Sequence, residues 1–146
     1  MKTTKILVPT DLSKLSRSAL SYAMEMAAAQ KAEVIVLSVI GEEGEWFGKD
    51  DACNPAKALV PEQERQLDQF VKENCAEFLD QVEIQQIVDV GVPYKEIVRK
   101  AEQEKADMIV MSTHGRTGLE HLMLGSVTEK VLAHAPCPVL SIRPHK

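Results

Sequence analysis

Five short apolar runs recur along the chain, and longer segments with a helical period of apolar residues separate them. Residues 5–9, 33–40 and 107–112 consist largely of Val, Ile, Leu and Met, which is typical of strands buried on both faces of a parallel sheet. Residues 82–90 have one mostly polar side and residues 138–143 are short, so we expect these two runs at the sheet edges. Strands that alternate with helices predict an α/β fold on a parallel sheet.

Four helices are expected between these strands. The first covers residues 13–30, and the third has Pro93 in its first turn, where the missing N–H costs no hydrogen bond. The fourth begins near Gly125, where Ser126 and Glu129 form the S-x-x-E pattern of a capping box. The expected apolar faces are Leu67, Val71, Cys75 and Phe78 in the second helix, Tyr94, Ile97, Val98 and Ala101 in the third, and Val127, Val131 and Leu132 in the fourth.

Right-handed connections, with the three most apolar strands at the centre, give the strand order 3-2-1-4-5. We therefore expect one Rossmann-like domain over residues 1–146, an open parallel five-stranded sheet with helices on both faces. Residues 41–60 show no period and are expected to form a surface loop or lid. The winding of the chain reverses between the first and fourth strands, and open α/β sheets bind ligands at such a switch point. The loops after these two strands are thus the candidate site.

The composition excludes several classes of protein. The formal net charge of −5 gives no support for nucleic-acid binding, and the 45% of hydrophobic residues is ordinary for a globular chain. No apolar run approaches the roughly 20 residues that cross a bilayer, and the N-terminal residues lack the features of a signal peptide. Cys53, Cys75 and Cys137 match no zinc or redox spacing, so we expect reduced thiols in the cytoplasm.

The loop after the fourth strand has features of a phosphate site. Gly115 follows that strand closely, and Gly125 with Ser126 begins a helix whose first N–H groups and positive end favour an anion. Arg116 adds a cation. The alternative is that the glycines serve tight turns, that Ser126 caps the helix and that Arg116 is solvated.

Two further polar side chains lie in these loops. Asp11 could accept hydrogen bonds from ribose hydroxyls or an adenine amino group, or it could cap the first helix, as could Ser13. His114 could orient a ligand or carry a proton, or it could make a structural hydrogen bond. The sequence contains no Walker P-loop, nucleophile elbow, metal-ligand cluster or paired carboxylates, so we expect neither catalytic residues nor protein metal ligands.

The segments KILVPTDLSKLSRSAL and ADMIVMSTHGRTGLEHLMLGSVTEKVLAHAPCPVLSIR resemble the universal stress protein family, and the resemblance is weakest over residues 41–81. ATP-binding members carry the motif G-x2-G-x9-G-[ST]. Gly115, Gly125 and Ser126 match this motif, whereas Ser112 stands where the family has its first glycine. If the added Cβ crowds the ligand, Ser112→Gly should tighten ATP binding.

The resemblance implies a nucleotide site built from both loops and the end of the second strand. In it, residues around Asp11 would flank the adenosine, Val39 would meet the adenine, and Val127 with Thr128 would continue the phosphate cradle. The full set of ligand-binding residues that it implies is Pro9, Thr10, Asp11, Val39, Met111, Ser112, His114, Gly115, Arg116, Gly125, Ser126, Val127 and Thr128.

The resemblance also implies a function and an assembly. It indicates a cytoplasmic stress-response protein that binds ATP, with Mg²⁺ or Mn²⁺ on the phosphates, and signals in a nucleotide-dependent way with slow hydrolysis at most. The alternative is a dimeric stress protein that acts through protein partners without a nucleotide. An ATP-using enzyme is disfavoured because HxGH and SGGxDS motifs are absent. We expect a homodimer through the apolar last strand, which proline at Leu140 or Ile142 should disrupt.

Overall fold

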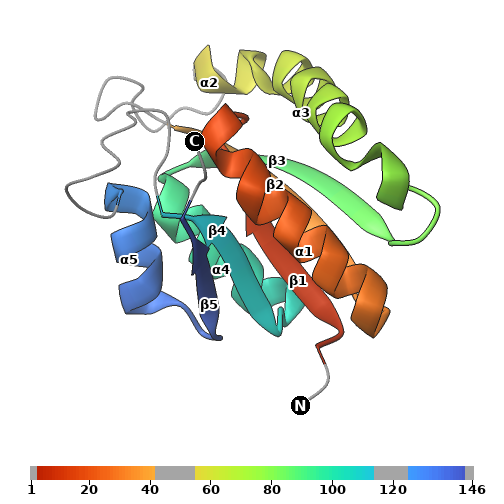
Figure 1. The fold of residues 1–146 in the computed structure, drawn as a ribbon. Helices are drawn as coiled ribbons and strands as arrows, with labels where there is room; N and C mark the ends of the chain where they lie inside the picture. The colour runs from red at the N-terminus through yellow and green to blue at the C-terminus, as the bar shows by residue number, and fades with distance from the viewer. Residues whose placement is uncertain (1–2, 42–54, 114–124, 144–146) are drawn as a thin grey trace.

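The protein is described here from a computed structural model that covers residues 3–41, 55–113 and 125–143. It contains one five-stranded parallel sheet with the order β3-β2-β1-β4-β5, so the predicted fold class and strand order are confirmed (Figure 1). The strands are β1 (Lys5–Pro9), β2 (Glu33–Gly41), β3 (Ile84–Gly91), β4 (Met108–Ser112) and β5 (Val139–Ile142). The α-helices are α1 (Arg17–Gln30), α2 (Pro55–Ala58), α3 (Val60–Cys75), α4 (Pro93–Glu104) and α5 (Ser126–His134), and the 3-10 helices are η1 (Lys14–Ser16) and η4 (Ala76–Phe78).

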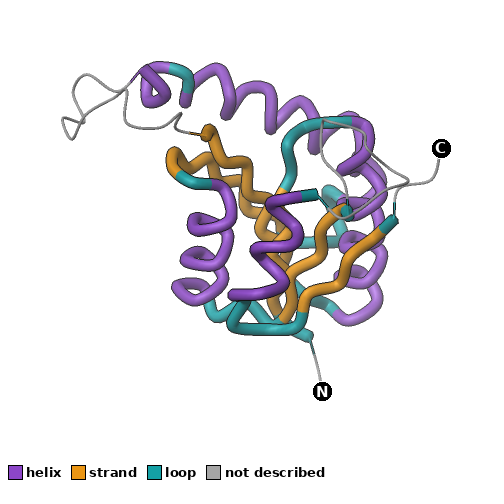
Figure 2. Tube along the Cα trace, turned by 90° about the vertical axis from the view of Figure 1, so that its left-hand side faces the viewer, coloured by secondary structure: helices purple, strands orange, loops and turns teal. Residues whose placement is uncertain are grey.

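Two helical layers cover the sheet, one on each face (Figures 1 and 2). Because side chains alternate along a strand, Ile6 and Val8 of β1 pack with residues of α1 and α3. Leu7, which lies between them in β1, packs on the other face with Ile97 of α4 and Val131 of α5. All five of these side chains are fully or almost fully buried, so two apolar clusters hold the central strands and fix where their carboxyl ends lie.

The helix boundaries differ from the prediction at two places before β3. The first helix was expected to begin at residue 13, but Ser13 is extended and caps the 3-10 turn η1. Regular α-helix starts only at Arg17. The segment expected to be irregular up to residue 60 contains the short helix α2, which at four residues is too short to show a period. The expected loop over residues 42–54 lies outside the described residues.

The fourth helix also corrects the sequence analysis. Gly125 is its N-cap in extended conformation, and no side chain caps it, so the predicted capping box between Ser126 and Glu129 is wrong. The buried face consists of Thr128 and Val131, whereas Leu132 is 43% exposed. A buried threonine is tolerated here because its hydroxyl has a backbone partner in β4.

The described residues show free thiols at Cys75 and Cys137, and Cys53 lies outside the described ranges. Burial raises the pKa of the Cys75 thiol to about 11, so this cysteine is held in its neutral form. Among the described helices, none combines the length and the apolar character that a membrane crossing requires.

Asp107 fastens the start of β1 to the start of β4. Its Oδ2 accepts hydrogen bonds from Thr4 Oγ1 at 2.7 Å, Thr4 N at 2.9 Å and Lys5 N at 2.9 Å. These donors, with the Thr4 hydroxyl first, hold the pKa of the Asp107 carboxyl below its usual value. A carboxyl whose pKa is lowered by folding stabilises the fold above its unfolded pKa, and this contribution disappears as the pH falls through the folded pKa.

Asp107→Asn is therefore expected to lower the free energy of unfolding at neutral pH by about 1 kcal/mol, a value reduced for solvent exposure. Urea denaturation at neutral pH and below about pH 4 measures this, and the difference between the two proteins should shrink in acid. Asp80→Asn, at an exposed position, is the matched control. A pH-independent difference would show that the carboxylate's charge plays no part.

Candidate functional site

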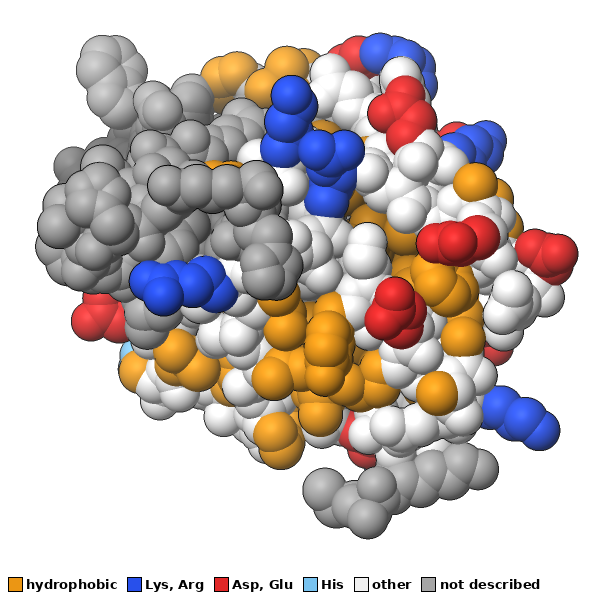
Figure 3. Space-filling model, in the orientation of Figure 1, with side chains coloured by type: hydrophobic (Ala, Val, Ile, Leu, Met, Phe, Trp, Pro, Cys, Tyr) orange, Lys and Arg blue, Asp and Glu red, His pale blue; other side chains and the backbone are white. Residues whose placement is uncertain are grey.

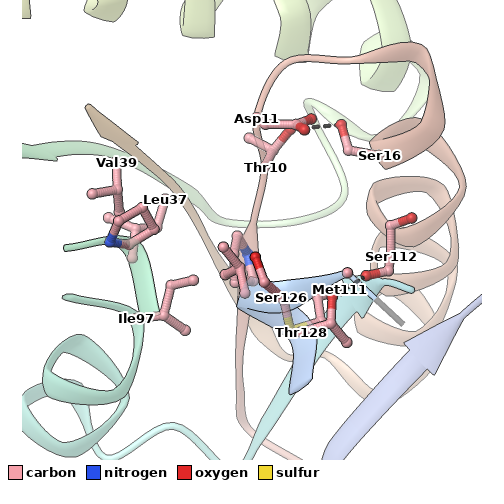
Figure 4. Close-up of a pocket in the computed structure, with 14 residues that line it drawn as sticks. Thr10, Asp11, Ser16, Leu37, Val39, Ile97, Met111, Ser112, Ser126 and Thr128 are labelled. Carbon is pink, nitrogen blue, oxygen red and sulfur yellow. Dashed lines mark hydrogen bonds between the residues drawn. The ribbon is translucent and has the colours of Figure 1, made fainter. Parts of the chain in front are cut away.

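A cavity of about 290 Å³ opens at the carboxyl ends of β1, β2 and β4, where the winding of the sheet reverses (Figure 4). Every candidate residue that the structure describes lines this cavity: Pro9, Thr10, Asp11, Val39, Met111, Ser112, Gly125, Ser126, Val127 and Thr128. The remaining candidates, His114, Gly115 and Arg116, lie outside the described residues. The sequence prediction thus brought together a set of residues that is contiguous in space.

The loop after β1 is held together by hydrogen bonds from its own side chains. Thr10 Oγ1 lies 2.8 Å from Ser16 Oγ and accepts a hydrogen bond from Leu12 N at 3.0 Å. Asp11 Oδ1 accepts from Ser13 N at 3.0 Å, and Ser13 Oγ caps η1 by accepting from Ser16 N at 3.3 Å. Of the two capping alternatives, Ser13 is therefore the cap of the first turn, and Asp11 is left at the cavity wall.

The end of β2 turns backbone groups toward the cavity. Leu37 O accepts from Thr10 N at 2.9 Å, and the pairing of β1 with β2 stops at Pro9 and Leu37. Val39 is two residues further along, so its N–H and C=O point to the same side of β2 as those of Leu37, beyond the paired part of β1. Among the described residues no backbone hydrogen bond reaches Val39 from this side. The N–H of Val39, a donor, and its C=O, an acceptor, therefore both face the cavity and lie next to each other.

The first turn of α5 lies at the other end of the cavity. Gly125 N donates to Thr113 O at 2.8 Å, and Thr128 Oγ1 donates to Ser112 O at 2.9 Å, which holds the helix start against the end of β4. The single proton of the Thr128 hydroxyl is used in this bond, so the side chain has none to donate to a ligand. The N–H groups of the first turn have no partner within the helix and carry its positive end.

Ser112 lines the cavity from β4, but its side chain leaves the strand toward the α1 side. Met111 packs in the cluster with α4 and α5 and Val110 in the cluster with α1, so alternation places Ser112 on the side of Val110. Figure 4 shows its hydroxyl pointing away from Ser126 and Thr128.

We expect Ser112→Gly to change the binding free energy of ATP by no more than about 0.5 kcal/mol, because the lost atoms lie on the side of the strand away from α5. Titration calorimetry of both proteins measures this. Tightening by about tenfold would instead show that the Cβ crowds the ligand.

Four lining residues were missed by the sequence analysis: Ser16, Leu37, Pro93 and Ile97. Leu37 shares a strand face with Val39, so the period of two along β2 could have indicated it. Pro93 and Ile97 line the cavity from α4, and Figure 4 shows Ile97 on the same side of the cavity as Leu37 and Val39. Pro93 is in the first turn of α4 and has no N–H, so this residue presents carbon rather than a donor to the cavity.

The cavity is polarised from one end to the other. Leu37, Val39 and Ile97 make its end between β2 and α4 apolar, whereas hydroxyls and helix N–H groups surround the end at α5. Among the described lining residues Asp11 is the only charged one. Such a cavity suits a ligand with a flat apolar part at one end and an anionic part at the other.

Comparison with known proteins agrees with the fold and with the resemblance to the family. The family model described as the universal stress protein family matches residues 2–143. The chain belongs to this family. Among curated relatives, Universal stress protein MJ0531 from Methanocaldococcus jannaschii is 36% identical over 97% of this chain and 83% of its own.

Solved structures give the same result. The structure of MJ0577, 33% identical, superimposes with a TM-score of 0.83 over 100% of this chain and 99% of that one. A universal stress protein from Archaeoglobus fulgidus in complex with dAMP is 23% identical, with a TM-score of 0.68 over 97% and 99% of the two chains. At that identity the likeness concerns the fold, and the nucleotide is a property of the Archaeoglobus protein.

Proposed function

We propose that this universal stress protein binds ATP in the cavity at the switch point. The observation that carries the proposal is that one cavity joins the backbone donor and acceptor of Val39 to the N-terminus of α5. A dAMP complex of a protein with the same fold supports an adenine nucleotide as the class of ligand.

The base belongs at the end between β2 and α4. Adenine has an acceptor, N1, beside a donor, the N6 amino group, and Val39 has a donor beside an acceptor. The Val39 N–H can thus donate to N1 while its C=O accepts from N6. The side chains of Leu37 and Ile97 supply the apolar contact that a purine ring needs.

The order of the strands supports a position for the rest of the nucleotide. β1 lies between β2 and β4, so Asp11 at the end of β1 stands between the base end and α5. A carboxylate only accepts hydrogen bonds, and ribose hydroxyls are the donors at that place in the ligand. We therefore assign the ribose to Asp11.

The phosphates belong at the first turn of α5, where N–H groups of Ser126, Val127 and Thr128 and the helix dipole favour an anion. A divalent cation bound with ATP would be held mainly by the phosphate oxygens, because the described residues contain no group of His, Cys, Asp and Glu side chains that could hold a metal ion. We propose that the bound nucleotide acts as a signal in the stress response and that hydrolysis is slow at most.

Discrimination between ATP and GTP tests the assignment of the base. Guanine has a donor at N1 and an acceptor at O6. Its N1–H would therefore face the Val39 N–H, and its O6 would face the Val39 C=O, so neither pair could form a hydrogen bond. We expect ATP to bind at least about tenfold more tightly than GTP, since unpaired buried groups cost about 1–3 kcal/mol. ITP shares guanine's N1–H and O6 without the 2-amino group and should bind as weakly as GTP. Equal affinities for ATP and ITP would refute the Val39 assignment.

We further propose a homodimer through β5. On the face of the molecule that Figure 3 shows, hydrophobic side chains lie together over β5 and the adjacent side of α1. Leu140 and Ile142 of β5 are only half-buried. Ser141 Oγ is buried without a hydrogen-bond partner among the described residues, which a second copy of the strand could supply. Two-fold symmetry would pair β5 with its own copy.

A further inference from the structure

We infer that Leu12 is a positioning residue for Asp11: the left-handed backbone of Leu12, anchored by its side chain, sets the direction of the Asp11 carboxylate at the cavity. The inference rests on the proposed function, because it takes the assignment of Asp11 to the ribose from there. It adds a residue outside the cavity wall that controls how the ribose is recognised.

Leu12 has an unusual backbone conformation for its residue type and place. Its φ is 66°, in the left-handed region that residues with a Cβ avoid. Among the described residues other than glycine, Lys31 and Lys105 also have positive φ, but each is the C-cap of a helix, where a left-handed residue ends the helix. Leu12 ends no helix, and it lies between β1 and η1 beside the candidate site. A left-handed residue with a Cβ that ends no helix points to a function for the loop.

Hydrogen bonds and packing hold Leu12 in this conformation. Its side chain packs against the apolar cluster between the sheet and α1, and its N–H donates to Thr10 Oγ1. Ser16 Oγ donates its one proton to Ser13 O at 2.8 Å. In the contact between Thr10 and Ser16 the threonine hydroxyl must therefore donate. The bonds form a chain that runs in one direction, from Leu12 N–H through Thr10 and Ser16 to the carbonyl of Ser13.

This chain fixes the backbone on both sides of Asp11. Thr10 is 93% buried and its hydroxyl is committed, while Leu12 is held by its side chain and its N–H. Asp11 Oδ1 is in turn fastened to Ser13 N. The carboxylate is ordered before a ligand arrives, so binding the ribose does not have to order the loop. A residue at position 12 that allows other backbone conformations should release the carboxylate.

The test is the ratio of dissociation constants for 2′,3′-dideoxyATP and ATP, measured by titration calorimetry. The wild-type ratio is expected to be about tenfold, and Asp11→Ala should bring it near unity. Leu12→Gly should lower it to within about twofold of the Asp11→Ala value, and the double variant should lower it no further. Lys31→Gly and Lys105→Gly remove the same kind of left-handed residue from helix ends and should keep the wild-type ratio.

Leu12→Asn separates backbone geometry from packing. Asparagine adopts the left-handed conformation readily, so this variant should keep most of the wild-type ratio although it lacks the apolar anchor. The inference is overturned if Leu12→Gly binds ATP with the wild-type ratio, or if a folded Leu12→Asn loses the ratio as fully as Asp11→Ala. The second criterion stands even if Leu12→Gly does not fold. A wild-type protein that binds ATP without discriminating the analogue removes the inference and the assignment of the ribose to Asp11 but leaves ATP binding in the cavity standing, whereas one that binds no ATP removes the proposed function as a whole.

Discussion

Gly125→Val is expected to lower ATP affinity by at least about tenfold, or about 1.4 kcal/mol, and to leave the fold intact. Gly125 has φ −61° and ψ 152°, a conformation open to every residue, so its backbone does not require glycine. We expect the benefit of glycine to be the missing side chain, because the side chain of an N-cap residue lies over the first-turn N–H groups. A valine side chain would stand between these groups and a phosphate.

The matched control is Gly41→Val at the end of β2, where an added Cβ would meet no atom of the described residues within 4 Å. Titration calorimetry and thermal unfolding of both variants separate loss of binding from loss of structure. Gly41→Val should bind ATP as the wild type does. If Gly125→Val also binds with unchanged affinity, the phosphates do not lie at the start of α5.

Ser141→Pro is expected to convert a dimer into monomers. Thr113 N donates to Ile142 O and Ile109 N donates to Pro138 O, so the even-numbered residues of β5 turn their backbone groups toward β4. The N–H of Ser141 therefore points outward, to the edge that a second copy would use. A proline there removes a donor from the interface and none from the sheet.

The same geometry corrects the expectation that proline at Leu140 or Ile142 would remove an outward donor. Both amides face β4, so these substitutions would weaken the sheet itself. Light scattering of the protein as it elutes from a size-exclusion column measures its oligomeric state, with Ser141→Thr as a control that keeps both the N–H and the hydroxyl and should stay dimeric. A monomeric wild type at micromolar concentration, or a dimeric Ser141→Pro, would exclude this interface.

The fold was predictable because the apolar runs, which are the clearest pattern in the sequence, also determine the strand order. Apolar runs such as residues 33–40 are buried on both faces, and right-handed connections leave few ways to order them. The prediction was wrong where a helix boundary depends on contacts between segments that are far apart in the sequence. The fourth helix starts at Ser126 because Gly125 is fastened to Thr113, which is contact between distant segments, and the S-x-x-E pattern occurs without forming a capping box.

The site was predictable to the extent that it depends on strand ends. Asp11 follows from the switch-point rule and Val39 from the family resemblance, and both line the cavity. The wall formed by Ile97 depends on how α4 packs across the sheet, and its helical period indicates a core position without saying that it borders a cavity. The left-handed Leu12 has no signal in the sequence, because leucine is not a residue that favours this conformation.

Backbone amide chemical shifts of the ¹⁵N-labelled protein, followed by NMR during a titration with ATP, test the central claim most directly. We predict saturable shifts that are largest at Val39, Ser126 and Val127, with the amides of Lys31 and Lys105 at the opposite end of the sheet unchanged. The absence of saturable shifts at millimolar ATP, or shifts that cluster away from the carboxyl ends of β1, β2 and β4, would contradict an adenine-nucleotide site in this cavity.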